Sequence, residues 1–160
     1  MLEPSYKTIT QQAVTDKDGD FLINLYLTTR EKELEALQHC TDHQKQLFIK
    51  QQYNSQYHHY THNYPAANLN VLIAGGQRIG RLYVHRTDKH IQLMDIILMP
   101  SMRNQGIGTY LVSQLIEEAK KNVCSLGLHV ELFNPARNFY EKLGFSVQEN
   151  LEFYHCMQWQ

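Results

Sequence analysis

The segment from Arg103 to Thr109 combines residue types that suit the binding of an anionic group. It reads Arg-Asn-Gln-Gly-Ile-Gly-Thr, after an apolar run that Pro100 ends and at the start of an amphipathic run. The first N–H groups of a helix have no intrahelical partner, so a helix beginning here would offer an anion site, which the helix dipole strengthens. Glycine at 106 and 108 lets a phosphate approach the backbone, and Arg103 can add a charge-assisted hydrogen bond. The alternative is that the glycines only form a tight turn.

Two common nucleotide-binding motifs do not fit this turn. A dinucleotide-binding turn needs GxGxxG, but the third glycine position is occupied by Leu111. A P-loop needs a lysine followed by Ser or Thr after the glycines, and no lysine follows them here. Neither motif therefore accounts for the glycines.

A second group of residues, from Asn134 to Phe145, reads Asn-Pro-Ala-Arg-Asn-Phe-Tyr-Glu-Lys-Leu-Gly-Phe. Together with Arg103, Gly106 and Gly108, it resembles the GNAT superfamily of acyl-CoA-dependent N-acyltransferases. One family signature is Arg or Gln, two residues, Gly, one residue, then Gly or Ala; the other is an Asn, a Tyr and a Leu-Gly-Phe ending. The resemblance implies an α/β (α+β) GNAT fold, with a central twisted mixed sheet of six to seven strands, splayed middle strands and about four flanking helices.

The resemblance also implies acetyl-CoA as co-substrate, with its pantetheine arm between the strands near 91–99 and 128–133. These strands usually splay at a bulge, where exposed backbone groups act like a sheet edge. By this resemblance the main chain of Ile97 and Leu98 binds the arm, and Asn134 contacts it from the other side. The pyrophosphate site then comprises Arg103 and the N–H groups of Asn104, Gln105, Gly106, Ile107, Gly108 and Thr109.

The implied reaction moves an acetyl group to an amine by direct attack in a ternary complex, without a covalent enzyme intermediate. The departing CoA thiolate has a pKa of about 8.5, so a positioned acid assists its departure without being essential. Tyr140 resembles the usual acid of the family. The alternative is that Tyr140 is only a packed aromatic on a short helix.

The proton acceptor is left open by the sequence. A primary ammonium, with a pKa of about 10, must lose a proton before its nitrogen attacks a thioester. Asp95 is a candidate because it lies within an apolar strand, where burial without a partner would raise its pKa. His129 and Glu131 are further candidates on one face of the next strand, and water is another. Each of the three side chains can instead be purely structural.

The acceptor is expected over the first two helices and the final hairpin, as in the family. Glu31 and Glu33 could attract a cationic amine, or they could simply be solvated. The tyrosines at 53, 57, 60 and 64 form a stripe that suits either a core or an aromatic wall for a cation. His58 and His62 have the i, i+4 spacing of a metal pair, but no HExxH-type motif accompanies them, so no metal is expected.

Periodicity and turn signals predict the elements that must position these residues. Helices are expected after capping segments at 15–18 and 41–44, from Ile107 with an apolar stripe, and at 135–143. Pro65 should end the second helix. Strands are expected at 6–9, 68–74, 79–85, 90–99 and 126–133, with one or two more in 145–158, and the glycines at 75 and 76 indicate a hairpin turn.

Composition predicts a single domain over residues 1–160. The 15 Lys and Arg nearly balance 16 Asp and Glu, so no field exists to attract nucleic acid or an anionic membrane. No window approaches the roughly 20 apolar residues of a membrane span, and the N-terminus has no apolar signal region. The cysteines at 40, 124 and 156 form no paired or ligand-like spacing and indicate reduced thiols, hence a cytoplasmic protein.

Two points about partners stay open at the level of sequence. The apolar final strand ending at Trp159 is compatible with a homodimer, but a sheet edge or a core position explains it equally well. A catalytically silent acyl-CoA-binding sensor or partner module is the alternative to an enzyme. The presence of Tyr140 and Asn134 favours the enzyme.

Overall fold

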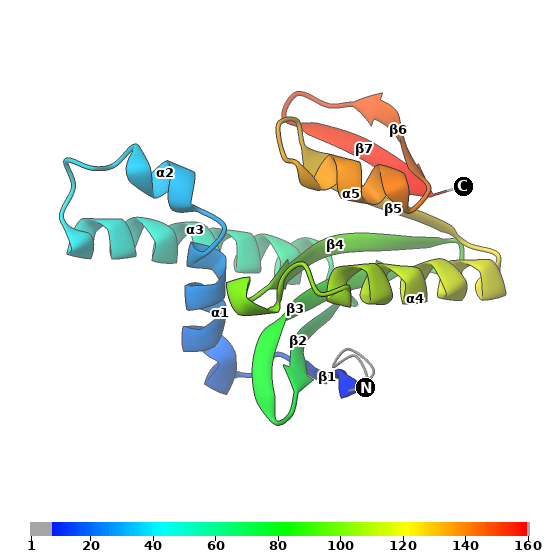
Figure 1. Cartoon of the computed structure of the whole chain (residues 1–160), viewed down its shortest axis with the longest axis horizontal. Helices are drawn as coiled ribbons and strands as arrows, with labels where there is room; N and C mark the ends of the chain where they lie inside the picture. The colour runs from blue at the N-terminus through cyan, green and yellow to red at the C-terminus, as the bar shows by residue number, and fades with distance from the viewer. Residues whose placement is uncertain (1–7, 160) are drawn as a thin grey trace.

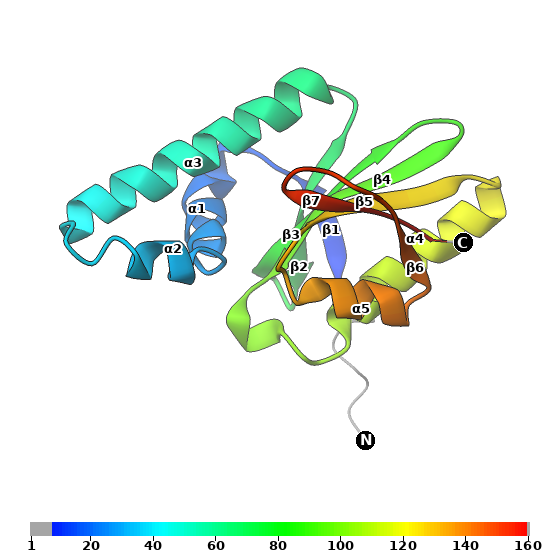
Figure 2. The ribbon, with the colours of Figure 1, turned by 90° about the horizontal axis from the view of Figure 1, so that it is seen from above.

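The computed structural model describes residues 8–159 of the 160-residue chain. Helices flank both faces of a central sheet (Figures 1 and 2). The helices and strands in chain order are β1 (Thr10–Ala13), α1 (Gly19–Leu27), α2 (Glu31–Glu35), α3 (Asp42–Asn63), β2 (Asn68–Ala74), β3 (Gln77–Arg86), β4 (His90–Leu98), α4 (Ile107–Asn122), β5 (Ser125–Glu131), α5 (Ala136–Lys142), β6 (Phe145–Asn150) and β7 (Tyr154–Trp159).

The seven strands form one mixed sheet in the order β1-β2-β3-β4-β5-β7-β6, in which β4 and β5 are parallel and the other neighbours antiparallel. This confirms the predicted fold class. Five α-helices are described instead of about four, because the sequence does not predict the short, largely solvated α2. Of the strand expected at 6–9, residues 6 and 7 lie outside the described residues, and the first described strand begins at Thr10.

The middle of the sheet opens between β4 and β5. These strands pair only from His90 to Leu93 and from Ser125 to Leu128; beyond that, β4 stays with β3 and β5 stays with β7. Met94 has no partner on β3, so a bulge lies where the two strands part. The predicted splay and bulge are therefore confirmed, and they leave an unpaired strand edge on each side of the gap.

Local signals fix the helices that flank this gap. Thr41 and Gln44 form the predicted capping box at the start of α3, with 3.1 Å from Gln44 N to Thr41 Oγ1 and 2.8 Å from Thr41 N to Gln44 Oε1. Thr15 and Asp18 form another, which caps a 3₁₀ turn leading into α1. Helix α3 ends at Asn63, two residues before Pro65.

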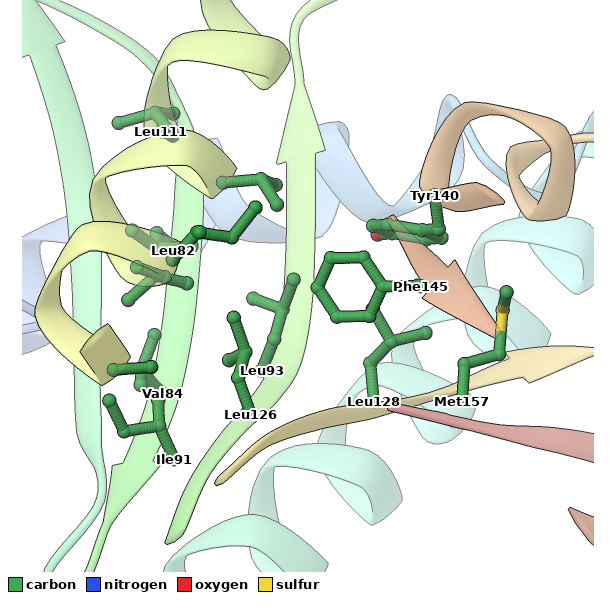
Figure 3. Close-up of a cluster of buried hydrophobic side chains, with 14 of the residues drawn as sticks. Leu82, Val84, Ile91, Leu93, Leu111, Leu126, Leu128, Tyr140, Phe145 and Met157 are labelled. Carbon is green, nitrogen blue, oxygen red and sulfur yellow. The ribbon is translucent and has the colours of Figure 1, made fainter. Parts of the chain in front are cut away.

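Two apolar clusters hold the helices against opposite faces of the sheet. The larger cluster joins α4 and α5 to the sheet and includes Leu93, Leu111, Leu128 and Met157 (Figure 3). The smaller one joins α1 and α3 to β2 and is centred on buried residues such as Leu22. Met157 is fully buried in the larger cluster, so a core position explains the apolar final strand. The homodimer stays an untested prediction. None of the helices described between residues 8 and 159 is long and apolar enough to cross a membrane.

Candidate active site

Two adjoining cavities occupy the gap between β4 and β5. One has a volume of about 300 Å³ and extends to Gln56, Tyr60 and Arg81, on the α3 side of the sheet. The other, of about 1070 Å³, extends to the loop before α4. Both are lined by Asn134 and Tyr140, so the cavities form one cleft that passes through the sheet.

The exposed edge of β4 is set by its register with β3. Met99 N donates to Ile79 O (2.8 Å), and hydrogen-bonded pairs alternate in an antiparallel ladder, so the peptide groups of Ile97 bond to β3. The peptide groups of Ile96 and Leu98 therefore point into the gap. Leu98 O already accepts a hydrogen bond from Arg103 Nε (2.9 Å). Of the two predicted residues, Leu98 presents its backbone to the cleft, while Ile97 lines it without a free peptide edge.

Ile96 was not predicted from the sequence. The bulge at Met94 decides which residues of β4 turn their peptide groups to the gap, and a bulge leaves no mark in an apolar run.

The glycine-rich turn places the start of α4 beside the larger cavity. Gly106 is the residue before the helix and has φ 85°, a left-handed conformation that favours glycine. The first helical hydrogen bond runs from Tyr110 N to Gly106 O (3.0 Å), which leaves the N–H groups of residues 107–109 without helical partners. The cavity is lined here by Arg103, Asn104 and Gly108.

The other predicted residues of this turn do not line the larger cavity. Ile107 is buried in the core, and Gln105 donates from its side chain to Ser101 O (2.7 Å). Thr109 and Gly106 are not among the residues that line the cavity. Arg103 links the end of β4 to the end of α1, because it also donates from Nη2 to Thr28 Oγ1 (2.9 Å).

Tyr140 lies at the junction of the two cavities. Helix α5 supplies it, and the ring packs edge-on against that of Phe145, with centroids 5.7 Å apart (Figure 3). It also packs edge-on against Phe139, with centroids 5.1 Å apart. Burial and the negative charge of Asp95 raise the pKa of the Tyr140 phenol well above its usual value. The phenol is therefore held in its neutral, proton-donating form.

Asn134 has a structural role in addition to the predicted one. Its Oδ1 accepts a hydrogen bond from the N–H of Ala136 (2.9 Å), the first residue of α5. The side chain thus fixes the helix that carries Tyr140, and it lines both cavities.

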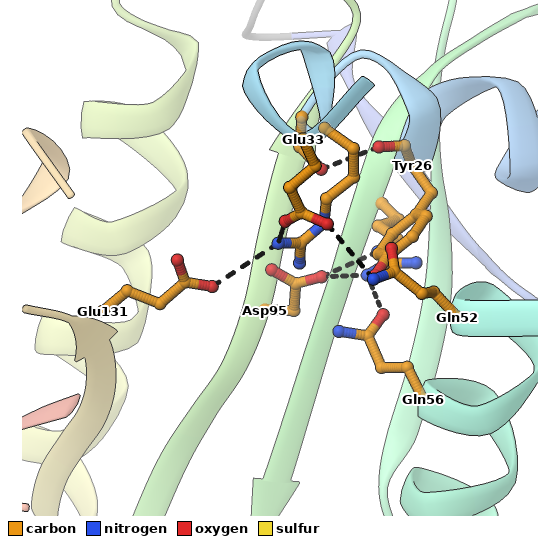
Figure 4. Close-up of polar contacts among 9 residues, drawn as sticks. Tyr26, Glu33, Gln52, Gln56, Asp95 and Glu131 are labelled. Atoms are coloured by element: carbon orange, nitrogen blue, oxygen red, sulfur yellow. Dashed lines mark hydrogen bonds and ion pairs between the residues drawn. The ribbon is translucent and has the colours of Figure 1, made fainter. Parts of the chain in front are cut away.

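Asp95 lies in the smaller cavity, where it is paired with Arg81, an arginine whose side chain is only 1% exposed. Arg81 donates from Nε (2.8 Å) and from Nη2 to the same oxygen, Asp95 Oδ2, and also from Nη2 to Gln56 Oε1 (2.8 Å; Figure 4). Within residues 8–159, Asp95 Oδ1 receives no hydrogen bond, so one carboxylate oxygen is left for a ligand. Sequence reasoning missed Arg81, because a buried partner across two strands has no local signature.

The Arg81–Asp95 pair predicts a large change in stability. Asp95→Asn leaves the buried guanidinium without its counter-charge and is expected to lower the free energy of unfolding by about 3–5 kcal/mol, measured by urea denaturation. The double replacement Arg81→Met with Asp95→Leu removes both charges and should recover most of this loss. As a control, Glu118→Gln breaks the more exposed pair with Arg86 (2.7 Å) and should cost at most about 1 kcal/mol. Equal losses in Asp95→Asn and Glu118→Gln would contradict this account.

His129 and Glu131 both lie on β5 and line the smaller cavity, as strand alternation predicts. The centroids of the His129 and Tyr154 rings are 6.4 Å apart, and their planes make an angle of 39°. The Glu131 side chain extends from β5 towards the α1–α2 segment, where Arg30 Nη1 is 3.7 Å from Glu131 Oε1 (Figure 4). An ion pair therefore links β5 to the α1–α2 segment.

The tyrosine stripe divides between core and cavity. Tyr53 is buried in the core formed with α1, whereas Tyr60 lines the smaller cavity. His58 and His62 stack on each other at 5.8 Å. Among residues 8–159, no group of three or more His, Cys, Asp or Glu side chains is arranged to hold a metal ion.

Comparison with known sequences identifies one family. The model of the acetyltransferase (GNAT) family matches residues 25–145. No curated protein sequence matches the chain significantly.

Solved structures share the fold at low sequence identity. The PaiA N-acetyltransferase from Thermoplasma acidophilum, solved with coenzyme A, is 17% identical, has a TM-score of 0.67, and matches over 95% of this chain and 98% of its own. Arabidopsis thaliana Naa50, solved with a bisubstrate analogue, is 17% identical with a TM-score of 0.62 over 96% and 99% of the two chains. The spermidine/spermine N-acetyltransferase SpeG from Vibrio cholerae, solved with manganese ions, is 18% identical with a TM-score of 0.61 over 96% and 93%.

Proposed function

Because the chain belongs to the acetyltransferase (GNAT) family, we propose that it transfers an acetyl group from acetyl-CoA to the nitrogen of an amine. The observation that carries this proposal is the cleft between β4 and β5. It has an unpaired strand edge along one wall, the start of α4 at one end and Tyr140 at its centre. A thioester on an extended arm and an amine can meet there from opposite faces of the sheet.

We assign acetyl-CoA to the larger cavity. The pantetheine amides bond to the β4 edge at Leu98 and Ile96, and Ile97 contacts the arm through its side chain. The pyrophosphate lies on the N–H groups at the start of α4, with Arg103 beside it. Asn134 faces the arm from the opposite wall. The structural neighbours solved with coenzyme A and with a bisubstrate analogue support this assignment.

In the reaction proposed for this cleft, each proton that moves has a donor and an acceptor. The ammonium of the acceptor gives one proton to Asp95 Oδ1, directly or through water, and its nitrogen then attacks the thioester carbon. Backbone N–H groups of the β4 edge stabilise the oxyanion as the C–N bond forms. The C–S bond then breaks, Tyr140 protonates the thiolate, and the nitrogen releases a second proton that restores the phenol. Asp95 returns the first proton to water, which restores the base.

Direct transfer fits the composition of the cleft. None of the three cysteines lines either cavity, so no thiol is positioned to form an acyl intermediate. The same three cysteines are free, which supports our assignment of the protein to the cytoplasm.

Calorimetric titration of the protein with acetyl-CoA tests the proposed co-substrate. Acetyl-CoA is expected to bind at one site with a micromolar dissociation constant, and coenzyme A should compete with it. ATP, which shares the adenine nucleotide but lacks the pantetheine arm, should bind at least tenfold more weakly. Absence of acetyl-CoA binding, or equal affinity for ATP, would overturn the proposal.

A further inference from the structure

Arg81 on β3 has the most buried charged side chain of residues 8–159. Three elements hold its guanidinium group. The central carbon lies 4.6 Å from the centre of the Tyr83 ring on β3 and 5.9 Å from that of the Tyr26 ring on α1. From α3, Gln56 Oε1 accepts a hydrogen bond from Nη2 (2.8 Å). A guanidinium enclosed in this way is fixed in orientation, and its burial means that it acts on a ligand only through the groups that it bonds.

The contact between Arg81 and Asp95 uses one carboxylate oxygen. Nε (2.8 Å) and Nη2 both donate to Oδ2, whereas an arginine–carboxylate pair frequently uses both oxygens. Oδ1 is turned away from Arg81 (Figure 4). It receives no hydrogen bond from the described residues, and it is not one of their buried polar atoms without a partner. Because Asp95 lines the smaller cavity, Oδ1 is open to that cavity.

Asp95 shares this cavity with Tyr140, which lies on the other side of the gap between β4 and β5. Burial and then the charge of Asp95 raise the pKa of the Tyr140 phenol, so the carboxylate acts electrically across the cleft. In the proposed reaction the amine approaches the thioester between these two side chains. The direction in which Oδ1 points is therefore set on the side of the cleft where the proton must leave.

We propose that Arg81 is a positioning residue for acetyl transfer, which holds Asp95 by Oδ2 so that Oδ1 faces the acceptor amine. This inference rests on the proposed function, in which Oδ1 accepts the proton of the amine. Arg81 touches neither substrate. Without its two donors the carboxylate is free to rotate, and Oδ1 spends less time within hydrogen-bonding distance of the amine.

The alternative role for Arg81 is only to neutralise the charge of Asp95 within the sheet. Lysine separates the two roles, because it keeps the positive charge but lacks the planar fork of donors. If Arg81 only neutralises Asp95, lysine preserves both stability and activity. If Arg81 positions Asp95, lysine preserves much of the stability and loses activity.

The variant Arg81→Lys tests this difference. The rate is measured on an acceptor set of alanine, trialanine, phenethylamine and spermidine, and the fastest acceptor is used for every variant. We expect Arg81→Lys to lower kcat by roughly 10- to 100-fold, because a misplacement of about 1 Å can cost about that much. The dissociation constant of acetyl-CoA should stay unchanged, since Arg81 does not line the larger cavity. The variant should also unfold at a higher urea concentration than Asp95→Asn.

Arg86→Lys is the matched control. Arg86 lies on the same strand and donates from Nε to Glu118 Oε2 (2.7 Å), but it lies outside both cavities. Its replacement should leave kcat within about twofold of the wild-type value. If kcat in Arg81→Lys also stays within about twofold, the inference is wrong while acetyl transfer itself stands.

The double replacement Arg81→Met with Asp95→Leu provides a second test, which applies even if Arg81→Lys does not fold. It contains no unpaired charge and should bind acetyl-CoA as the wild-type protein does, while kcat falls by roughly 10²- to 10⁴-fold with the loss of the base. A folded double variant with full activity would overturn the inference and leave the proposed function intact. Absence of acetylation of every amine by the wild-type protein would overturn both.

Discussion

Replacement of Tyr140 by phenylalanine is expected to lower kcat by roughly 10²- to 10⁴-fold, the range that general acid catalysis supplies. The phenol lies where the two cavities meet, and its ring packs between Phe139 and Phe145. Phenylalanine keeps that packing and removes only the hydroxyl group. The dissociation constant of acetyl-CoA, measured by calorimetry, should therefore stay unchanged while kcat falls.

A control separates this role from a general sensitivity to lost hydroxyl groups. Tyr64→Phe removes a hydroxyl that lies outside both cavities and should leave kcat within about twofold. Full activity in Tyr140→Phe would show that the thiolate leaves without an acid from this residue.

The pH profile should carry the sign of the Tyr140 pKa shift. Burial and the charge of Asp95 raise this pKa above the ordinary phenol value of 10.0, so the hydroxyl stays protonated where half of a free phenol would be ionised. Loss of the Tyr140 proton should therefore not reduce kcat anywhere below pH 10. An alkaline loss of activity below pH 10 that disappears in Tyr140→Phe would contradict the assignment.

The second large effect is expected at Gly106. Gly106→Asp should weaken acetyl-CoA binding by about 100-fold or more, as measured by calorimetry. Two causes act together: φ 85° strains a non-glycine residue, and a carboxylate at the start of α4 repels a pyrophosphate.

Gly106→Asn is the matched control for this position. Asparagine adopts the left-handed conformation about as readily as aspartate but carries no charge, so it should cost at most about tenfold in affinity. Equal affinities of the two variants would show that no anion lies near the start of α4. Circular dichroism would establish that both variants are folded.

Much of the fold follows from local signals in the sequence. The Thr41 capping box, Pro65 and Gly106 each set where a helix begins or ends, through local backbone chemistry. The two motifs around Gly106 and Tyr140 likewise predict the family, which the match over residues 25–145 confirms.

The parts of the site that could not be predicted depend on contacts between distant segments. The bulge at Met94 directs the peptide groups of Ile96 rather than Ile97 into the gap, and an uninterrupted apolar strand gives no sign of it. Arg81 reads as an ordinary polar position of a half-buried strand, yet it is 1% exposed because Asp95 on the neighbouring strand neutralises it. Arg30 joins the cleft only because the segment between α1 and α2 approaches β5 in space.

The most direct test of acetyl transfer is whether CoA release requires an amine. Purified protein is incubated with acetyl-CoA, with and without the acceptor set, and free CoA thiol and the mass of the amine are followed together. We predict amine-dependent release of CoA with stoichiometric acetylation of the amine. When both substrates are varied, the lines of a double-reciprocal plot of initial velocity should intersect, as a ternary complex requires. Binding of acetyl-CoA without release of CoA on any amine would contradict the enzyme assignment and favour a sensor of acyl-CoA.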